Sequence, residues 1–309
     1  MKKRVAVLMG GMSPEREVSL TSGKACAKAL RAEGYDVTEI DVTPNLWEQL
    51  HAADPDVIFN ALHGKWGEDG RVQGVLDLFG ASYTHSGVMA SALAMDKHRS
   101  KAVLRDVGIN VPDGTLVSRV SASETHPIDP PYVLKPNGQG SSVGVYIIKD
   151  YAHNYGPEIA ANTDMGEMII AESFHAGREL TVTVMDGKAL AVTEIIPKSG
   201  WYDYEAKYAE GGSRHVVPAD IPESVAEICK AWALLAHEAL GCAGLTRSDF
   251  IFSDKNTENT DMVNKIVMLE LNTQPGMTST SLAPEQAAHV GLTFGQLCRW
   301  IVEDASWPR

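Results

Sequence analysis

Near its C-terminal end the chain reads Leu269-Glu270-Leu271-Asn272-Thr273-Gln274-Pro275-Gly276, directly after the apolar run Ile266-Val267-Met268. Such an apolar run is typical of a buried strand. Alternate side chains of a strand share a face, so Glu270 and Asn272 are predicted to point one way and the two leucines beside Glu270 the other. One face then presents a carboxylate and an amide oxygen. These are hard oxygen ligands of the kind that Mg²⁺ prefers, with phosphates filling its remaining positions.

An upstream segment repeats this arrangement. Arg247 and Asp249 stand two residues apart, just before the apolar residues 250–252. If the two strands pair, these side chains converge with Glu270 and Asn272 on one spot. The alternative is a half-buried strand pair with solvated charges on its open face. The presence of both segments, the second ending in Pro-Gly, favours a site that binds a metal ion and phosphate.

Length and composition describe an ordinary globular protein of more than one domain. A chain of 309 residues is long enough for two or three domains with cores of their own. It is 44% hydrophobic and 22% charged, which is usual for such proteins. The 40 acidic and 27 basic residues give a net charge of −13. Since no sizeable Lys/Arg cluster offsets this charge, neither nucleic acid nor an anionic membrane is expected as a partner.

The sequence predicts a cytoplasmic protein. The apolar core near the start is only about five residues long and runs into Gly10-Gly11, whereas the apolar region of a signal peptide needs roughly 7–15 residues. No apolar stretch approaches the ~20 residues that span a bilayer. The four cysteines lie far apart, without the spacing of metal ligands or of a redox pair. They are expected to be buried thiols of a reducing compartment.

The first part of the chain alternates strands with helices. A helix is predicted from Ser13-Pro14, as N-cap and first helical residue, to about Glu33. This alternation indicates parallel βαβ units in an open α/β sheet, where ligands meet the loops at the carboxyl ends of the strands. Two loops lie there, at residues 10–15 and 63–70. The strands are predicted at residues 5–9, 37–42 and 57–62.

The middle of the chain predicts a small antiparallel sheet. A basic helix is expected at residues 95–108 and an irregular connection at residues 111–131. The strands of the sheet are predicted at residues 132–136, 143–148, 168–172 and 179–185. Further on, apolar residues at three- and four-residue steps predict a helix at 222–240. The polar residues 253–264 are expected to form an exposed hairpin loop.

A glycine-rich loop, Asn137-Gly138-Gln139-Gly140-Ser141-Ser142, joins the first two strands of that sheet. It matches neither the GxxxxGK[ST] phosphate loop nor the GxGxxG dinucleotide fingerprint. Its place between antiparallel strands indicates a flap whose backbone N–H groups close over a nucleotide. Lys135 would then neutralise phosphate charge; the alternative is a surface lysine. Residues 201–208, with three tyrosines and a tryptophan, indicate a long loop or lid.

Taken in order, these motifs resemble the D-alanine–D-alanine ligases of the ATP-grasp superfamily. The likeness runs from Val5 to about Ile301. So many independent motifs in one order are not expected by chance. The segments that carry it are Gly10-Gly11-x-Ser13-x-Glu15-Arg16-Glu17-Val18-Ser19, Leu62-His63-Gly64-x-x-Gly67-Glu68-Asp69-Gly70, Ser86-Gly87-Val88-x-Ala90-Ser91, Met95-Asp96-Lys97, Lys135-Pro136 with Gly140-Ser141-Ser142-Val143-Gly144, Tyr202-Asp203-Tyr204-Glu205-Ala206-Lys207-Tyr208, Arg247-x-Asp249 and Glu270-x-Asn272-Thr273-x-Pro275-Gly276-Met277-Thr278.

The resemblance implies an α/β protein with an ATP-grasp fold behind an N-terminal Rossmann-like domain with a parallel sheet. The implied domains are residues 1–95 (Rossmann-like), 96–185 (central ATP-grasp subdomain with the flap) and 186–309 (C-terminal ATP-grasp subdomain with the metal and substrate site). The implied enzyme is a homodimer that uses ATP, with two Mg²⁺ or Mn²⁺ ions, to phosphorylate one D-alanine. A second D-alanine then attacks the D-alanyl phosphate, and the dipeptide supplies peptidoglycan synthesis.

The resemblance also assigns roles to single residues. The lysines at the nucleotide phosphates would be Lys97, Lys135 and Lys207. The adenine and ribose contacts would be Glu172 and Glu179. The metal ligands would be Asp249, Glu270 and Asn272.

The remaining roles concern the two amino acids. Glu15 would hold the first ammonium group, linked by hydrogen bonds to Ser141 and Tyr208, with His63 beside that substrate. Arg247 and the Gly276 N–H would stabilise the tetrahedral oxyanion. The second carboxylate would be bound by Ser281 and Leu282.

Two departures from the family pattern and three alternatives remain. Ser173 stands where many relatives have lysine, and the stretch 253–264 is longer than usual. A ligase for D-lactate or D-serine is the nearest alternative, but ester-forming relatives usually carry phenylalanine at the position of Tyr208. A non-catalytic binding protein is disfavoured because the metal carboxylates and Arg247 are present. A nicotinamide-dependent oxidoreductase is disfavoured because the fingerprint is missing.

Overall fold

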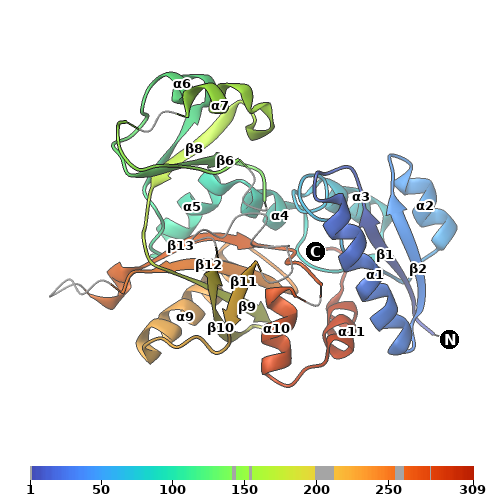
Figure 1. The fold of residues 1–309 in the computed structure, drawn as a ribbon. Helices are drawn as coiled ribbons and strands as arrows, with labels where there is room; N and C mark the ends of the chain where they lie inside the picture. Colours follow the sequence, from blue (N-terminus) through green and yellow to red (C-terminus); the bar gives the residue numbers. More distant parts are fainter. Residues whose placement is uncertain (1, 141–143, 153–154, 199–211, 255–260, 279) are drawn as a thin grey trace.

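The computed structural model describes residues 2–140, 144–152, 155–198, 212–254, 261–278 and 280–309. Within these ranges the strands form three sheets, one parallel and two antiparallel (Figure 1). The predicted α/β class is therefore confirmed. Every helix of the described part is too short or too polar to cross a membrane.

The N-terminal sheet is parallel, with strand order β2-β1-β3-β4. Its strand β1 is buried on both faces, as is usual for a parallel sheet. Ala6 and Leu8 face one apolar core, and Val5 and Val7 face another. Its strands are Arg4–Gly10 (β1), Asp36–Val42 (β2), Val57–Asn60 (β3) and Ser82–Tyr83 (β4). The helices around it are Arg16–Ala32 (α1), Leu46–Ala53 (α2) and Arg71–Phe79 (α3).

Helix α1 begins at Arg16, so the prediction of a start at Ser13-Pro14 is wrong. The Ser13 hydroxyl donates a hydrogen bond to the His63 carbonyl at 2.6 Å. It also accepts one from the Glu15 N–H at 3.1 Å. Because this hydroxyl is engaged with the neighbouring loop, the chain turns once more before the helix starts. Glu15 is thereby left at the N-terminal boundary of α1, at the carboxyl edge of the sheet.

The small sheet is antiparallel and has a core of its own. Its strand order is β5-β8-β6-β7. One face of β6 and β8 packs Leu134 and Ala171 against its two short helices. The strands are Gly114–Ser118 (β5), Tyr132–Pro136 (β6), Tyr146–Ile148 (β7) and Met168–Ser173 (β8). The helices are Arg119–Glu124 (α6) and Gly156–Ala161 (α7).

Two expectations for this region are wrong. Residues 111–131 hold β5 and α6 instead of an irregular connection. The strand Arg178–Met185 (β9) belongs to the large sheet, where it pairs with β10 and β12. Leu180, Val182 and Val184 pack there in the core beneath helix α9. A strand pattern in the sequence identifies a strand but not its partner.

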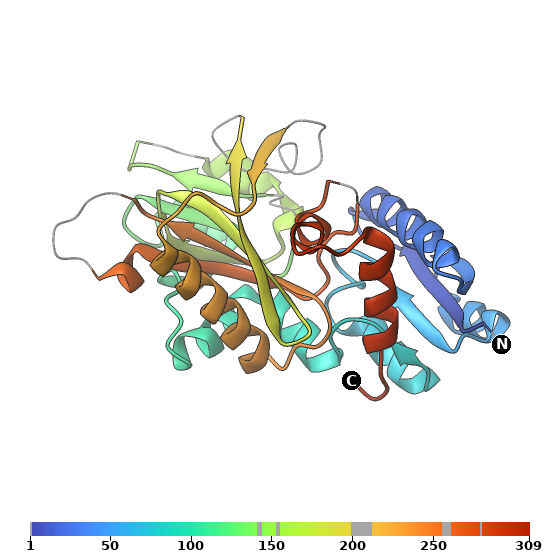
Figure 2. The ribbon, with the colours of Figure 1, turned by 90° about the horizontal axis from the view of Figure 1, so that it is seen from below.

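The large sheet is antiparallel, with strand order β11-β10-β9-β12-β13. Helix α9 (Glu223–Ala239) covers one face, close to the predicted range 222–240, and Figure 2 shows it running along the sheet. Strands β10, β11 and helices α10 and α11 had no counterpart in the prediction. The strands, besides β9, are Lys188–Pro197 (β10), Ser213–Val216 (β11), Thr246–Phe252 (β12) and Ile266–Asn272 (β13). The C-terminal helices are Leu282–His289 (α10) and Phe294–Asp304 (α11).

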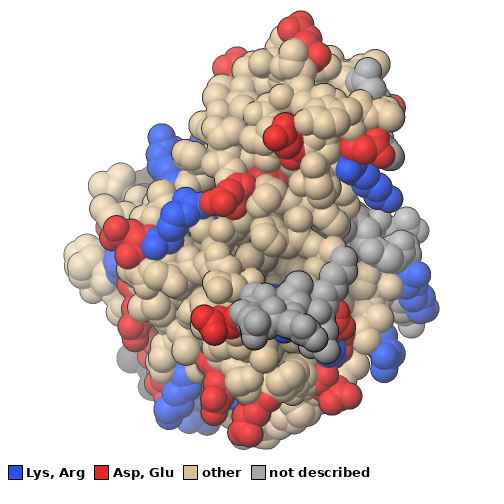
Figure 3. All heavy atoms as spheres, turned by 90° about the vertical axis from the view of Figure 1, so that its left-hand side faces the viewer, with Lys and Arg blue, Asp and Glu red and all other residues tan. Residues whose placement is uncertain are grey.

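The three sheets are joined differently. The N-terminal and large-sheet regions share an apolar core, in which Val5 and Val7 pack with Met185, Leu245 and residues of α11. Helices α4 (Val88–Met95) and α5 (Lys97–Asp106) lie between the small and large sheets (Figure 1). On the face shown in Figure 3, the surface is hollowed between the lobe of the small sheet and the body below it.

Candidate active site

The predicted convergence of the two polar strand segments is present. Strands β12 and β13 are antiparallel neighbours in which Asp249 lies opposite Glu270 and Arg247 opposite Asn272. The next pair is Phe250 with Met268, so Leu269 is an extra residue in a β-bulge. Leu269 consequently lines the same cleft as Glu270. The expectation that it points to the opposite face is wrong because the bulge breaks the alternation.

Asp249 is buried and held by three neighbours. The Arg247 guanidinium donates from Nε to Oδ1 at 2.9 Å and from Nη2 to Oδ2 at 2.8 Å. Thr181 donates its hydroxyl to Oδ1 at 2.7 Å. Asn272 donates its amide to Oδ2 at 3.2 Å. These partners supply the charge and hydrogen bonds that a buried carboxylate requires.

Lys97, the first residue of α5, joins β13 to the glycine-rich loop. Its ammonium lies 3.3 Å from the Glu270 carboxylate and donates a hydrogen bond to the Gln139 carbonyl at 2.7 Å. The side chain is 7% exposed, so it is held beside the cleft and not free in solvent.

Asn137 fixes the start of that loop to α5, a role that the sequence analysis missed. Its side-chain oxygen accepts from the His98 N–H and its side-chain nitrogen donates to Asp96, both at 2.9 Å. Its carbonyl accepts the Lys97 N–H at 3.1 Å. The loop and the N-terminal end of α5 are therefore one hydrogen-bonded unit. An asparagine directly before a glycine was the available sequence signal.

A first cleft of about 840 Å³, part of it open to solvent, lies between the small and large sheets. The glycine-rich loop borders it through Gln139 and Gly140. Six of the residues predicted for the nucleotide and metal site line it: Lys97, Lys135, Glu172, Glu179, Asp249 and Glu270.

The small sheet places two of these residues on one face. In β6 and β8, Glu172 lies opposite Val133 and Lys135 opposite Ile170, so the lysine and the glutamate are diagonal neighbours. The Lys135 ammonium is 2.5 Å from Oε1 of Glu172, and Lys101 of α5 contacts Oε2. Burial opposes the charge of Lys135, but the negative charges of Glu172 and Glu270 together outweigh burial and raise the pKa of this lysine. The cleft thus holds a lysine that remains protonated.

A second hollow of about 700 Å³, also partly open to solvent, adjoins the first. Gly140 and Glu270 line both. The second hollow brings together residues from the N-terminal loops, from β12 and β13, and from the segment after β13. Its lining includes the predicted residues Glu15, His63, Arg247, Glu270, Asn272, Gly276, Ser281 and Leu282.

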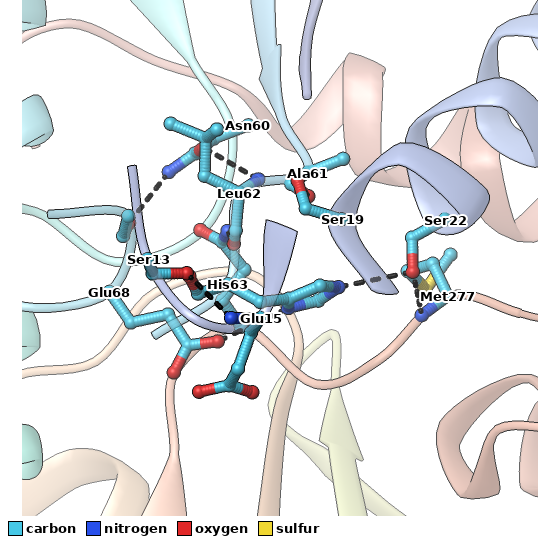
Figure 4. Close-up of polar contacts among 12 residues, drawn as sticks. Ser13, Glu15, Ser19, Ser22, Asn60, Ala61, Leu62, His63, Glu68 and Met277 are labelled. Atoms are coloured by element: carbon cyan, nitrogen blue, oxygen red, sulfur yellow. Dashed lines mark hydrogen bonds and ion pairs between the residues drawn. The ribbon is translucent and has the colours of Figure 1, made fainter. Parts of the chain in front are cut away.

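His63 is fixed on both ring nitrogens. Nδ1 lies 3.2 Å from Oε1 of Glu68, and Nε2 lies 3.1 Å from the Ser22 hydroxyl. Figure 4 shows the carboxylates of Glu15 and Glu68 pointing the same way, on the side away from Ser22. Both glutamates line the second hollow. The sequence pattern indicates no separate role for Glu68, which shares a motif with His63, and none for Ser22.

The segment after β13 is folded tightly at Gly276. Ser281 accepts a hydrogen bond from the Thr278 N–H at 3.0 Å and lies 2.8 Å from its hydroxyl. A Cβ added to Gly276 would lie 2.9 Å from the Ser281 hydroxyl, so no larger residue fits without a shift. Gln274 donates to the Leu62 carbonyl, and the Met277 N–H donates to Ser22 at 3.4 Å. These bonds tie the segment to the N-terminal region, at the loop after β3 and at helix α1.

Three predicted site residues, Ser141, Lys207 and Tyr208, lie outside the described residues. The other predicted site residues line one or both hollows. Among the described residues there is no group of three or more His, Cys, Asp and Glu side chains that could hold a metal. The predicted set has two carboxylates and one amide.

Comparison with known proteins gives the family. A family model described as D-ala D-ala ligase C-terminus matches residues 103–303. A second, D-ala D-ala ligase N-terminus, matches residues 44–86. The chain belongs to the D-alanine–D-alanine ligase family.

Members of this family match the chain over nearly its whole length. The D-alanine–D-alanine ligase of Ruegeria sp. (strain TM1040) is 55% identical over 306 residues, which are 99% of this chain and 97% of the relative. The ligase of Methylobacterium radiotolerans is 54% identical over 312 residues and covers both chains fully.

A solved structure of the family has the same fold. The D-alanine–D-alanine ligase of Bacillus anthracis in complex with ATP superimposes with a TM-score of 0.81 at 30% identity. The match covers 98% of this chain and 97% of that one. The ATP-grasp fold expected for the family is thereby confirmed.

Proposed function

We propose that this protein uses ATP to join two D-alanine molecules into D-alanyl-D-alanine, a peptidoglycan precursor. The observation that carries the proposal is that Glu270 lines both hollows. A group bound in the first cleft and a group bound in the second can therefore meet at one carboxylate. Family membership supports the choice of substrates.

The first cleft is proposed as the ATP site. Lys97 and Lys135 bind the phosphates, joined by Lys207 from beyond the described residues. Glu172 and Glu179 contact the adenine and ribose. Phosphoryl transfer depends mainly on position and on neutralisation of charge, which suits buried lysines at the end of the cleft.

The donor set of β12 and β13 fits magnesium or manganese. Asp249, Glu270 and Asn272 offer only oxygen ligands from paired strands, and phosphates supply the others. Arg247 and Lys97 form ion pairs with the two carboxylates. When bound, two such ions would neutralise charge on the transferring phosphate.

The second hollow is proposed as the amino-acid site. Glu15 binds the ammonium of the first D-alanine, with His63 nearby and with Ser141 and Tyr208 completing the link. The carboxylate of that D-alanine receives the phosphoryl group. The amine of the second D-alanine, whose carboxylate is held by Ser281 and Leu282, then attacks the acyl carbon. Phosphate leaves and the amine loses a proton.

The oxyanion of that step needs nearby donors. The Arg247 guanidinium and the Gly276 N–H are proposed for this role, since both residues line the second hollow. Removal of water protects the acyl phosphate from hydrolysis, which gives the flap and the segment 201–208 a purpose.

The proposed domains are residues 1–95, 96–177 and 178–309. The second boundary precedes Arg178, and not residue 186, because β9 pairs within the large sheet. We further propose a homodimer in the cytoplasm, as family membership suggests.

The function is tested by incubating the protein with ATP, Mg²⁺ and D-alanine. Phosphate release and D-alanyl-D-alanine, detected by mass spectrometry, should rise together in a one-to-one ratio. L-Alanine is the matched control and should give neither product. In a competition between D-alanine and D-lactate or D-serine, faster formation of the mixed product than of D-alanyl-D-alanine would assign the protein to the alternative ligases. Phosphate release without any ligated product would contradict the proposal.

A further inference from the structure

Two buried cations share one carboxylate beneath the ATP cleft. Lys101 lies one turn after Lys97 on α5, so both lysines project from the same side of this helix. The Lys101 ammonium contacts Oε2 of Glu172, and Lys135 occupies Oε1. Lys101 is 3% exposed, Glu172 2% and Lys135 9%. The roles proposed above give Lys101 no task.

The charges of this cluster depend on one another. A buried charge is tolerated only when it is paired and hydrogen-bonded. Burial opposes ionisation of Glu172, yet the charges of Lys135 and Lys101 outweigh burial and lower its pKa. Burial and then the neighbouring charge of Lys135 lower the pKa of Lys101 to about 7. Glu172 is flanked by two lysine ammonium groups, so an anionic ligand in the cleft can bind one of them without leaving the carboxylate unpaired.

The two lysines differ in what they can reach. Lys135 and Glu172 line the first cleft, whereas Lys101 is not among the described residues that line it. A triphosphate in the cleft would attract Lys135 away from Oε1. Lys101, which lies on α5 and is not among the described lining residues, would stay on Oε2.

We propose that Lys101 is a positioning residue for ATP: it is the resident counter-ion that keeps Glu172 ionised and in place when phosphate draws Lys135 away. The inference rests on the proposed roles of Glu172 and Lys135. Without Lys101, the ammonium of Lys135 could pair with the phosphate or with Glu172, but it could not neutralise both. Either choice leaves an uncompensated charge in the closed site, which weakens nucleotide binding.

The test compares Lys101→Met and Lys101→Arg with the unchanged protein. Affinity for Mg²⁺-ATP is measured by calorimetry without D-alanine, and the KM for D-alanine is measured at saturating ATP. We expect Lys101→Met to weaken ATP about tenfold or more and Lys101→Arg to restore most of the loss. The KM for D-alanine should change less than about twofold, because its proposed hollow is not lined by the cluster.

Arg105→Met is the matched control. Arg105 stands one turn further along α5, with its side chain 51% exposed, and its loss should leave ATP affinity unchanged. Wild-type ATP affinity in Lys101→Met would overturn the inference.

A double variant separates positioning from general support of the fold. In a Glu172→Gln background the carboxylate that Lys101 serves is gone, so Lys101→Met should cost much less ATP affinity than it does alone. An equal loss in both backgrounds would overturn the inference. If Lys101→Met alone is too unstable for binding measurements, the melting temperature is measured instead of the ATP affinity. Adding Glu172→Gln should then recover part of the lost melting temperature. An unchanged melting temperature in the double variant would count against the inference.

The same variants test the proposed function separately. If Glu172→Gln weakens ATP while Lys101→Met does not, the nucleotide role of Glu172 stands and the inference alone fails. If Glu172→Gln binds ATP like the unchanged protein, the proposed role of Glu172 is wrong and the inference falls with it.

Discussion

Asp249 and Glu270 lie opposite each other on adjacent antiparallel strands, and each already has a cation beside it. Arg247 neutralises the first and Lys97 the second. Each carboxylate thus has a positively charged partner within the protein. Metal ions bound at the proposed site would neutralise these carboxylates in turn, and Arg247 and Lys97 could then contact the oxyanion and the phosphate.

This pairing predicts the effect of Glu270→Gln. The variant keeps the size of the side chain but removes the negative charge of one of the two carboxylates proposed as metal ligands. We expect kcat/KM to fall about a hundredfold or more and the remaining activity to need more Mg²⁺. Phosphate release over a Mg²⁺ titration measures both. Glu223→Gln, an exposed glutamate on α9, is the control; near-normal turnover of Glu270→Gln at limiting Mg²⁺ would contradict the assignment.

Gly276→Ala should damage the acceptor side of the site. The added methyl would lie 2.9 Å from the Ser281 hydroxyl, which must then move away from Thr278. We expect kcat/KM for D-alanine to fall about tenfold or more, with a loss of about 1–3 kcal/mol in the free energy of unfolding. ATP affinity should change little.

Gly74→Ala gives the matched comparison for Gly276→Ala. Gly74 lies in α3, and a Cβ added there meets no atom within 4 Å. Alanine should stabilise that helix by up to about 1 kcal/mol without changing activity. Equal kinetics for the two variants would remove Gly276 from the site.

Asn137→Ala should uncouple the glycine-rich loop from α5. It removes the bonds to His98 and Asp96, each worth about 0.5–1.5 kcal/mol. We expect the KM for ATP to rise about tenfold while the KM for D-alanine stays the same. Steady-state kinetics with each substrate varied in turn measure this. Asn45→Ala, at an exposed position of the N-terminal region, should change neither constant.

His85 makes the fold sensitive to acid. It is 1% exposed, and burial together with the charges of Arg309 and His63 lowers its pKa from 6.5 to about 3. Between pH 6.5 and pH 3 the imidazole is neutral in the folded protein, whereas in the unfolded chain it takes up a proton. Its contribution to stability is therefore complete above pH 6.5 and is lost as the pH falls toward 3. Between pH 7.5 and pH 5 it should account for about 2 kcal/mol.

The variant His85→Asn checks this sign. Asparagine tolerates the left-handed backbone at this position, where φ is 67°, but does not titrate. We expect it to be less stable than the unchanged protein at pH 7.5 and to lose about 2 kcal/mol less on going to pH 5. Urea unfolding at both values measures the difference. If both proteins lose the same free energy of unfolding between the two pH values, the pKa of His85 does not differ between the folded and unfolded states.

The sequence predicted those parts of the site that depend on local pattern. The pairing of Arg247 and Asp249 with Glu270 and Asn272 followed from alternation and is present. The bulge at Leu269 could not be foreseen, because it depends on the register that β12 imposes on β13. The sheet that contains β9 depends on packing against α9, which lies far along the chain.

Lys101 and Glu68 were missed for a related reason. Lys101 contacts a partner that is distant in the sequence, and Glu68 contacts a neighbour that is itself buried. Side-chain type alone does not reveal such partners. The helical spacing of Lys97 and Lys101 was the available signal for the first. For Glu68 the signal was its place in a motif that also contains His63.

The shared core of the N-terminal and large-sheet regions divides the molecule mechanically. Val5 and Val7 pack with Met185 and Leu245. The segment after β13 is hydrogen-bonded to the loop after β3 and to helix α1 of the N-terminal region. The small sheet has its own separate core. We therefore expect the N-terminal and large-sheet regions to move as one rigid body that carries the proposed binding sites of both amino acids. The small sheet is expected to rotate relative to this body. Such a rotation would open the nucleotide cleft and release ADP, while the distance between the two amino-acid binding sites stays the same.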